Sequence, residues 1–260
     1  MIVGHHKAMI NLRDRSKASG IHLVISLAIA ALAAALVFGI WFPYPYREIS
    51  GGRDLFILVV AVDVVMGPLI TLAVFSRAKP WAELRRDLAV VGLLQLLALG
   101  YGLWTVALAR PVHLVYEIDR FRVVHAVDVP EELLARTPSG ITAFPWLGPT
   151  PLAIRPFRTQ AENLDATMAA LGGVALGARP DFWRPYQDAR ADILRDAKPV
   201  AMLRTRFPQS AGPIDHVLRD AGRDPSTTAW MPVVGRNQAW TVFLDASTAD
   251  VVAFMPLDSL

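Results

Sequence analysis

The stretch Leu55–Phe75, LFILVVAVDVVMGPLITLAVF, decides the fold of this chain. It is an apolar run with one carboxylate, Asp63, and it is long enough to cross a bilayer as a helix. At about 1.5 Å of rise per residue, Asp63 lies roughly 12 Å inside the run. A central Asp costs a spanning helix about 2.5 to 3.5 kcal/mol. We therefore expect Asp63 to face the interior of a helix bundle or a bound partner.

Neighbouring residues share the Asp63 face of this helix. Gly67 and Thr71 follow Asp63 at i+4 and i+8, so acid, small residue and hydroxyl lie on one side. Pro68 removes one backbone donor and leaves carbonyl oxygens free beside this face. Two hypotheses remain open. Asp63 pairs inside the bundle, with Gln95 or the backbone near Pro68, or it docks a polar group on another membrane helix.

Two further apolar runs, Ile21–Phe42 and Leu88–Ala109, also have the length of membrane helices. The first ends in a cluster of aromatic residues typical of a membrane interface. It exceeds the usual apolar length of a signal peptide, so we favour an uncleaved signal anchor over a cleaved leader. The third run carries Gln95 and several glycines that allow close helix approach.

The basic residues predict an orientation. The N-terminal tail and the loop Ser76–Asp87 each hold four Lys or Arg, whereas Pro43–Asp54 holds two. The positive-inside rule then places the tail in the cytoplasm and the C-terminal part outside, which in a bacterium is the periplasm. The predicted organisation is a cytoplasmic tail at 1–20, a three-helix transmembrane region at 21–109 (21–42, 55–75, 88–109) and a periplasmic domain at 110–260.

Composition supports a membrane protein with a folded polar part. The 260 residues are 53% hydrophobic and carry a net charge of +3. Before Arg110 there are ten Lys or Arg and six Asp or Glu, and from Arg110 onward sixteen and seventeen, giving +4 and −1. The excess of Lys and Arg lies beside the predicted spans and not in a cluster on the folded domain. We therefore expect no nucleic-acid partner. The chain has no cysteine, which excludes disulfides and thiol chemistry.

The C-terminal part predicts one domain with both helices and strands. Val112–Ile118 and Phe121–Val127 indicate a hairpin, Thr159–Leu171 a helix and Val200–Leu203 a strand. Three apolar runs at 229–234, 239–244 and 251–255 predict a terminal antiparallel meander. The expected fold class is a membrane protein with three transmembrane α-helices followed by an α+β extracytoplasmic domain with an antiparallel sheet.

Signatures of enzymes are weak in this sequence. Ser76–Lys79 matches S-x-x-K without its companion motifs. His113, His125 and Asp128 match no recurrent metal-ligand spacing. Asp215–His216 has no nucleophile in sequence reach, and a helix surface explains it better. We expect no catalytic residue, no metal ion and no cofactor.

Four aromatic residues could form a shelf for a sugar or a peptide. In a domain of this size such residues more often pack in the core or at its rim, which is the interpretation we favour. They are Trp183, Tyr186, Trp230 and Trp240.

Motifs spread over nearly the whole chain after Lys17 resemble the TfpX/TfpZ family of type IV pilin accessory proteins. The most specific is D-x-x-x-G-P-x-x-T within Val62–Thr71. The family has Gly where this chain has Ala249, which puts only the final turn in doubt. The other motifs are Arg86–Leu88, Leu94–Gly102, Arg110–Pro111, Asp119–Phe121, Gly235–Asn237 and Asp245–Val251.

The resemblance implies an inner-membrane helper, without known catalysis, that acts on a cognate type IV major pilin and promotes its stability or assembly into pili. Before assembly, such a pilin is anchored in the membrane by one apolar helix. This helix has an acid near its start, and the globular head of the pilin lies outside the membrane. We expect contacts with that helix, with the head, with the lipid bilayer and with other pilus assembly components. The candidate partner-binding residues are Asp63, Gly67, Pro68, Thr71, Gln95, Tyr101 and Gly102.

Two other classes of function stay open. One is a membrane enzyme that modifies the pilin or its glycan, with Asp63, Glu117 or Asp119 as the catalyst. The other is a membrane-tethered sensor whose outer domain binds a small ligand. A pilin mass that depends on this protein would favour the enzyme, and a ligand-induced melting shift would favour the sensor.

Overall fold

The structure is a computed structural model that describes residues 2–76, 79–236 and 238–260, with side chains from Leu12 onward. The chain divides into two compact units. The helical unit comprises the chain up to Gly39 together with Arg53–Ala107. The sheet unit comprises Ile40–Gly52 together with Leu108–Leu260.

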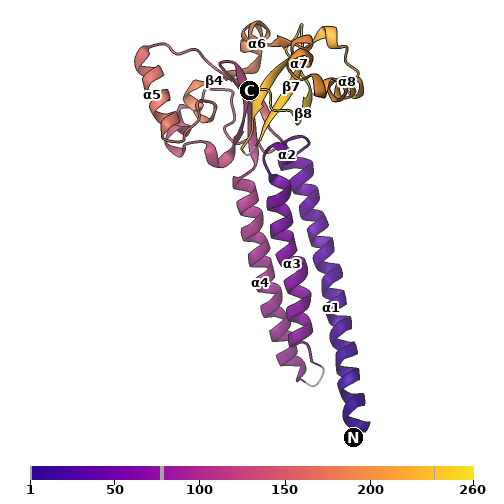
Figure 1. Ribbon diagram of the computed structural model, residues 1–260. Coiled ribbons are helices and arrows are strands. Elements are labelled where there is room, and N and C mark those ends of the chain that lie inside the picture. The colour runs from indigo at the N-terminus through magenta and orange to yellow at the C-terminus, as the bar shows by residue number, and fades with distance from the viewer. Residues whose placement is uncertain (1, 77–78, 237) are drawn as a thin grey trace. The chain divides into compact units, whose positions relative to one another are not determined.

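Three long helices make up the helical unit and run side by side in Figure 1. Each is long and apolar enough to cross a membrane, and only 17 to 22% of the most apolar window of each is buried within the protein. The predicted spans at 21–42, 55–75 and 88–109 overlap these helices, and their boundaries in a bilayer stay a prediction. The helices are α1 (Ile2–Leu36, extended by a π-helical turn at Val37–Trp41), α3 (Gly52–Val74) and α4 (Trp81–Leu108).

The connection between α1 and α3 belongs to the sheet unit and holds the short helix α2 (Tyr46–Ile49). Ile49 is fully buried in one of the apolar clusters of the sheet. A Cβ on Gly235 would lie 2.5 Å from Ile49 Cγ2, so glycine is what lets this turn approach α2. This contact gives a physical reason for the glycine in the Gly235–Asn237 motif, whose Asn237 lies outside the described residues.

The sheet follows the order β4-β3-β1-β2-β6-β7-β8, with β5 paired to β6. The predicted hairpin is confirmed as the antiparallel pair β1–β2, and the terminal meander as β6–β7–β8. The strands are β1 (Pro111–Glu117), β2 (Arg120–His125), β3 (Thr150–Ile154), β4 (Trp183–Pro185), β5 (Lys198–Pro199), β6 (Thr228–Val234), β7 (Ala239–Asp245) and β8 (Val251–Met255).

Helices cover the sheet, and three apolar clusters fill the space between the layers. Every residue of β1 is buried, including His113 and Glu117, so its apolar side chains do not alternate with exposed polar ones. Ile193 in α6 packs in one cluster, and Leu203 and Leu218 pack together in another. The helices of this unit are α5 (Gln160–Leu171), α6 (Arg190–Asp196), α7 (Val200–Arg206) and α8 (Ala211–Asp220).

Two predictions about this unit need correction. The sheet is mixed rather than antiparallel, because β1 pairs in parallel with β3 and β2 pairs in parallel with β6. Val200–Leu203 is the start of helix α7 and not a strand. Its apolar residues Val200 and Leu203 are three positions apart, so one helical face buries both of them.

Candidate partner-binding site

Asp63 lies at mid-length of α3 and is bound by Gln95 of α4. Gln95 Nε2 donates to the backbone oxygen of Asp63 at 3.2 Å and to its carboxylate Oδ1 at 3.4 Å. A Cβ on Gly67 would lie 1.9 Å from the same Nε2 atom, so the glycine makes room for the Gln95 amide. Residues predicted separately on two apolar runs are thus brought into one cluster.

Helix α1 supplies partners for the other end of this face. Ser19 Oγ donates to the backbone oxygen of Pro68 at 2.9 Å, and His22 Nδ1 shares a hydrogen bond of 2.5 Å with Thr71 Oγ1. Thr71 is 2% exposed. The sequence interpretation missed Ser19 and His22. His22 interrupts the start of an apolar run, and Ser19 lies two residues before that run. Each such polar group in a membrane helix needs a partner.

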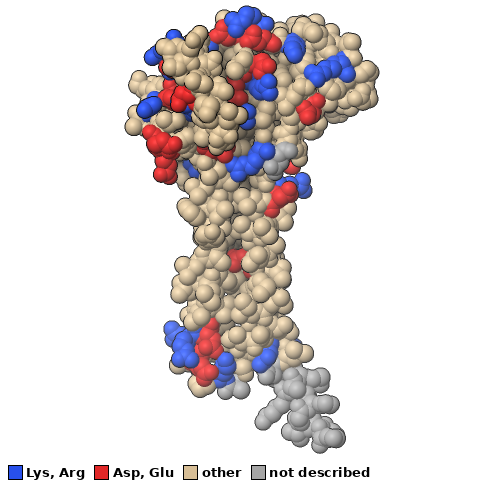
Figure 2. All heavy atoms as spheres, turned by 60° about the vertical axis from the view of Figure 1, so that its left-hand side comes forward, with Lys and Arg blue, Asp and Glu red and all other residues tan. Residues whose placement is uncertain are grey.

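A cavity of about 210 Å³ opens beside the Asp63 carboxylate, among the three helices. It is the size of a few side-chain groups, and both polar and apolar atoms face it. Its lining residues are His22, Ile25, Ser26, Ile29, Asp63, Gly92, Gln95, Leu96 and Leu99. Figure 2 shows that charged side chains gather at the ends of the helices and become sparse along their middle.

The remaining two predicted residues do not join this cluster. A Cβ on Gly102 would lie 2.4 Å from Val59 Cγ1, so Gly102 allows α4 to approach α3 at a separate point. Tyr101 is 68% exposed, and its ring lies 5.8 Å from that of Trp104. Tyr101 therefore belongs to the outer surface of the helical unit.

In the sheet unit, the motif residue Arg236 meets a carboxylate from the end of β2. Arg236 Nη2 binds Asp128 Oδ1 at 2.9 Å, and His125 Nδ1 binds Asp128 Oδ2 at 2.8 Å. Burial acts to raise the pKa of Asp128, but the hydrogen bonds and charge of His125, with Arg236, hold that pKa below its usual range. These three side chains, with Arg122, line a cavity of about 400 Å³.

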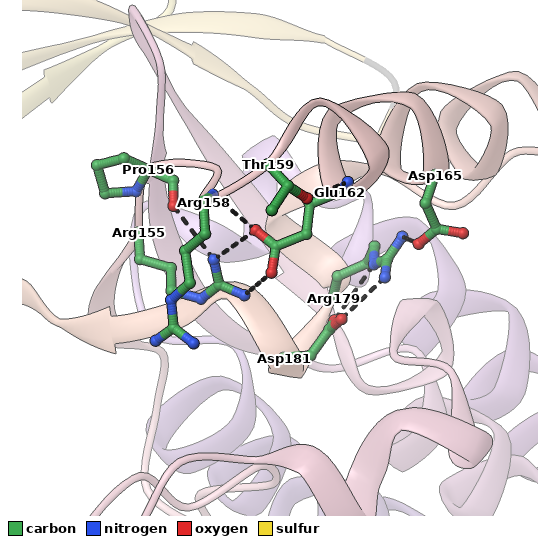
Figure 3. Close-up of polar contacts among 8 residues, drawn as sticks. All are labelled: Arg155, Pro156, Arg158, Thr159, Glu162, Asp165, Arg179 and Asp181. Atoms are coloured by element: carbon green, nitrogen blue, oxygen red, sulfur yellow. Dashed lines mark hydrogen bonds and ion pairs between the residues drawn. The ribbon is translucent and has the colours of Figure 1, made fainter.

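An ion-pair network fixes α5 against the rest of the sheet unit (Figure 3). Arg155 forms two parallel hydrogen bonds to Glu162, at 2.9 and 3.0 Å. These bonds, with the backbone N–H of Arg158, lower the pKa of Glu162 to about 2. The nearly buried Arg179 binds Asp181 at 2.8 Å and Asp165 at 2.7 Å.

The network leaves one face of α5 uncovered. Leu164, Met168 and Leu171, at i, i+4 and i+7, are 64, 59 and 79% exposed. The spacing places the three side chains on one stripe of the helix.

The weaker candidates of the sequence stay apart in the structure. Among the described residues, no group of three or more His, Cys, Asp or Glu is placed to hold a metal ion. His113 binds Thr150 and Ala143, while His125 binds Asp128. Asp215 pairs with Arg204. His216 lies 2.9 Å from Asp220 on the surface of α8.

Glu117 is bound by Arg122 and by the backbone N–H of Gly177, and Asp119 by Arg120. Residues 77–78, inside the S-x-x-K match, lie outside the described part of the chain. The four aromatic residues are core side chains, 1 to 5% exposed, and not a shelf: Trp183, Tyr186, Trp230 and Trp240.

Fold and site together define a protein with three apolar helices, a polar cluster between them and a separate α+β unit. Three helices, each long and apolar enough to cross a membrane, are joined by polar side chains from mid-length of α3 toward its end. The chain continues into an α+β unit whose own core is complete.

Comparison with known proteins identifies the family. The sequence model described as fimbrial assembly protein FimB matches residues 10–51. The fimbrial assembly protein of Dichelobacter nodosus serogroup I is 33% identical over 233 residues, covering 88% of this chain and 90% of the relative. The serogroup E1 protein of the same organism is 31% identical over 232 residues, with the same coverage. No solved structure matches the chain.

The chain therefore belongs to the FimB family of fimbrial assembly proteins. This finding confirms the resemblance to type IV pilin accessory proteins that was drawn from the motifs.

Proposed function

We propose that this protein acts in pilus assembly as an inner-membrane accessory protein that binds a cognate type IV major pilin. Membership of a family whose relatives are named fimbrial assembly proteins supports the pilus role. The predicted orientation, with the N-terminus in the cytoplasm and residues 110–260 in the periplasm, is part of the proposal. The protein acts by binding, without catalysis or a cofactor.

The observation that carries the proposal is the polar cluster around Asp63. The carboxylate receives its hydrogen bond from Gln95 at the long distance of 3.4 Å, and the 210 Å³ cavity lies directly beside it. A partly buried acid with one weak donor and adjacent space can accept a polar group from another helix. If that group is the acid of the pilin helix, the two carboxyl groups share a proton rather than form an ion pair.

The surface of the helices supports the same partner. Leu93, Leu94, Leu96 and Leu97 of α4 are 59 to 62% exposed within the protein. Such side chains pack equally well against lipid and against an apolar helix, so the binding energy of a partner comes from close packing and polar contacts. The small residues and the Asp63 cluster provide both.

For the pilin head, the stripe on α5 is the candidate contact. Exposed apolar side chains at helical spacing mark faces that bind other proteins. The bidentate Arg155–Glu162 pair and the Arg179 pairs hold this helix in place, so the stripe is pre-organised for binding. This part of the proposal therefore assigns the pilin head as the partner of the α5 stripe.

Recovery of pilin with the full-length protein tests the Asp63 site. Asp63→Asn has the shape and hydrogen-bonding capacity of a protonated acid, so we expect it to recover pilin as the wild type does. Asp63→Leu removes the polar group, and we expect most of the recovery to be lost. Val62→Leu, on the exposed side of the same helix, is the matched control and should have no effect. Equal recovery with both Asp63 variants would reject this site.

A further inference from the structure

The sheet unit contains an uncharged segment with exposed aromatic and apolar side chains, Thr137–Ile154. This segment has no charged residue, and Arg136 and Arg155 flank it. Its side chains Phe144, Trp146 and Leu147 are 37, 61 and 73% exposed. An exposed Trp-Leu pair in an uncharged loop is unusual on a surface that meets only water.

The first anchor of this loop is the π-helical turn Val37–Trp41 that follows α1. Gly148 donates its backbone N–H to the carbonyl oxygen of Ile40 at 3.0 Å. The rings of Trp146 and Trp41 lie 5.6 Å apart, edge to face. Trp41 is the last residue of the apolar helix Leu12–Trp41. Trp146 therefore contacts the last residue of the first apolar helix.

The second anchor is the strand that leaves the third span. Helix α4 ends at Leu108, and β1 begins at Pro111. From this strand His113 Nε2 donates to the carbonyl oxygen of Ala143 at 3.0 Å, and Thr150 Oγ1 donates to His113 Nδ1 at 2.7 Å. His113 is fully buried, so the loop is fixed to a residue only five positions beyond the end of α4.

We infer that residues 141–148 form an interfacial loop that inserts Phe144, Trp146 and Leu147 into the outer leaflet of the bilayer. Both anchors lie within a few residues of the end of an apolar helix long enough to span a membrane. Trp and Phe are the side chains that this interface favours, and the loop has no charge to desolvate. The partner is lipid, and the inference rests on the membrane placement in the proposed function but not on pilin binding.

The absence of cysteine makes a direct test practical. A spin label is attached to Leu147→Cys in the full-length protein, with one chain per lipid nanodisc and no pilin present. Its relaxation by oxygen, which enters lipid, is compared with relaxation by a water-soluble nickel chelate.

Two further labelled positions serve as controls. Ile118→Cys is the matched aqueous control, because Ile118 is 65% exposed and lies at the opposite end of β1, about 20 Å from Pro111. Leu97→Cys in α4, 61% exposed, is the lipid control.

We expect the ratio of oxygen to nickel accessibility at position 147 to approach that at 97 and to exceed that at 118 several-fold. A water-like ratio at 147 with a lipid-like ratio at 97 would overturn the interfacial loop and leave the membrane placement intact. A water-like ratio at both positions would overturn the loop and the membrane placement together. Because each disc holds one chain, neither a second copy nor a pilin can account for a protected label.

Discussion

The helical unit and the sheet unit treat their apolar side chains in opposite ways. At most 22% of the apolar window of any long helix is buried within the protein. In the sheet unit, by contrast, all seven residues of β1 are buried and three clusters fill both sides of the sheet. The sheet unit therefore carries its own stabilising core, while the stability of the helical unit depends on the lipid or helix that surrounds it.

The two units also differ in the kind of polar contact that joins their elements. In the sheet unit, arginine–carboxylate pairs such as Arg155–Glu162 and Arg184–Asp192 join elements at the surface. In the helical unit, hydrogen bonds join Gln95 to Asp63 at mid-length of α3 and His22 to Thr71 near its end. Isolated surface pairs contribute little each and bidentate pairs more, whereas polar groups inside a membrane must be satisfied. Substitutions in the two units should consequently have different effects.

The largest effect should come from a cavity in the core of the sheet unit. Ile193→Ala removes a fully buried side chain, and we expect a loss of about 2 to 5 kcal/mol in the free energy of unfolding. Leu97→Ala, on the exposed face of α4, should change it by less than about 0.5 kcal/mol. Denaturant unfolding of the full-length protein in nanodiscs, followed by tryptophan fluorescence, measures both. Equal losses would contradict the division between the two units.

Acid should weaken the sheet unit through His113. Burial, opposed by hydrogen bonds to Ala143 and Thr150, lowers the pKa of His113 to about 4. The unfolded chain, with a His pKa near 6.5, then binds more protons than the folded chain between about pH 4 and 6.5. The contribution of His113 to the free energy of unfolding is fully present above this window. It falls as the pH drops through the window, by about 2 kcal/mol between pH 7 and 5.

The variant His113→Gln isolates this contribution. It should be less stable at pH 7, because the ring contact with Trp183 is lost, but its stability should fall less steeply with acid. Unfolding curves at pH 7, 6 and 5 give the two slopes. Parallel slopes for the wild type and the variant would show that His113 titrates normally in the folded protein.

In the helical unit, Gly67→Ala should displace the Gln95 amide. The added methyl group would lie 1.9 Å from Gln95 Nε2, so the Gln95 side chain must move and its hydrogen bonds to Asp63 are weakened. We expect a net loss of about 1 to 2 kcal/mol, after the better helix propensity of Ala is counted. Gly100→Ala is the matched control, since nothing lies within 4 Å of its Cβ, and it should be neutral or stabilising. Unfolding in mixed detergent micelles, followed by circular dichroism, compares the two.

The sequence predicted the local features of both units and missed the long-range ones. The β1–β2 hairpin and helix α5 were predictable because their signals are contained in one stretch of chain, and Thr159 caps α5 through Glu162 as expected of a helix start. Strand β3 was not, because its residues Thr150–Ile154 include a proline and pair in parallel with a distant strand. Parallel pairing leaves no turn signal in the sequence.

The candidate site follows the same rule. The face of Asp63, Gly67 and Thr71 could be predicted from helical periodicity, and Gln95 was one of two partners considered. The contacts of His22 and Ser19 could not, because they depend on how α1 is rotated against α3. A lone polar residue in an apolar run shows that a partner exists, but the sequence does not specify which one.

The smallest effect concerns the turn between β7 and β8, where this chain departs from the family motif. Ala249 has a φ of +61°, in the left-handed region that favours glycine, and the turn forms nevertheless. Ala249→Gly should relieve about 1 to 2 kcal/mol of backbone strain and lose about 0.8 kcal/mol of burial, because the methyl group is fully buried. We expect a net gain below about 1 kcal/mol, measured as a small rise in the melting temperature. A marked loss of stability would mean that the packing of this methyl group, and not the backbone, determines the turn, and that the core of the sheet unit extends to its last hairpin.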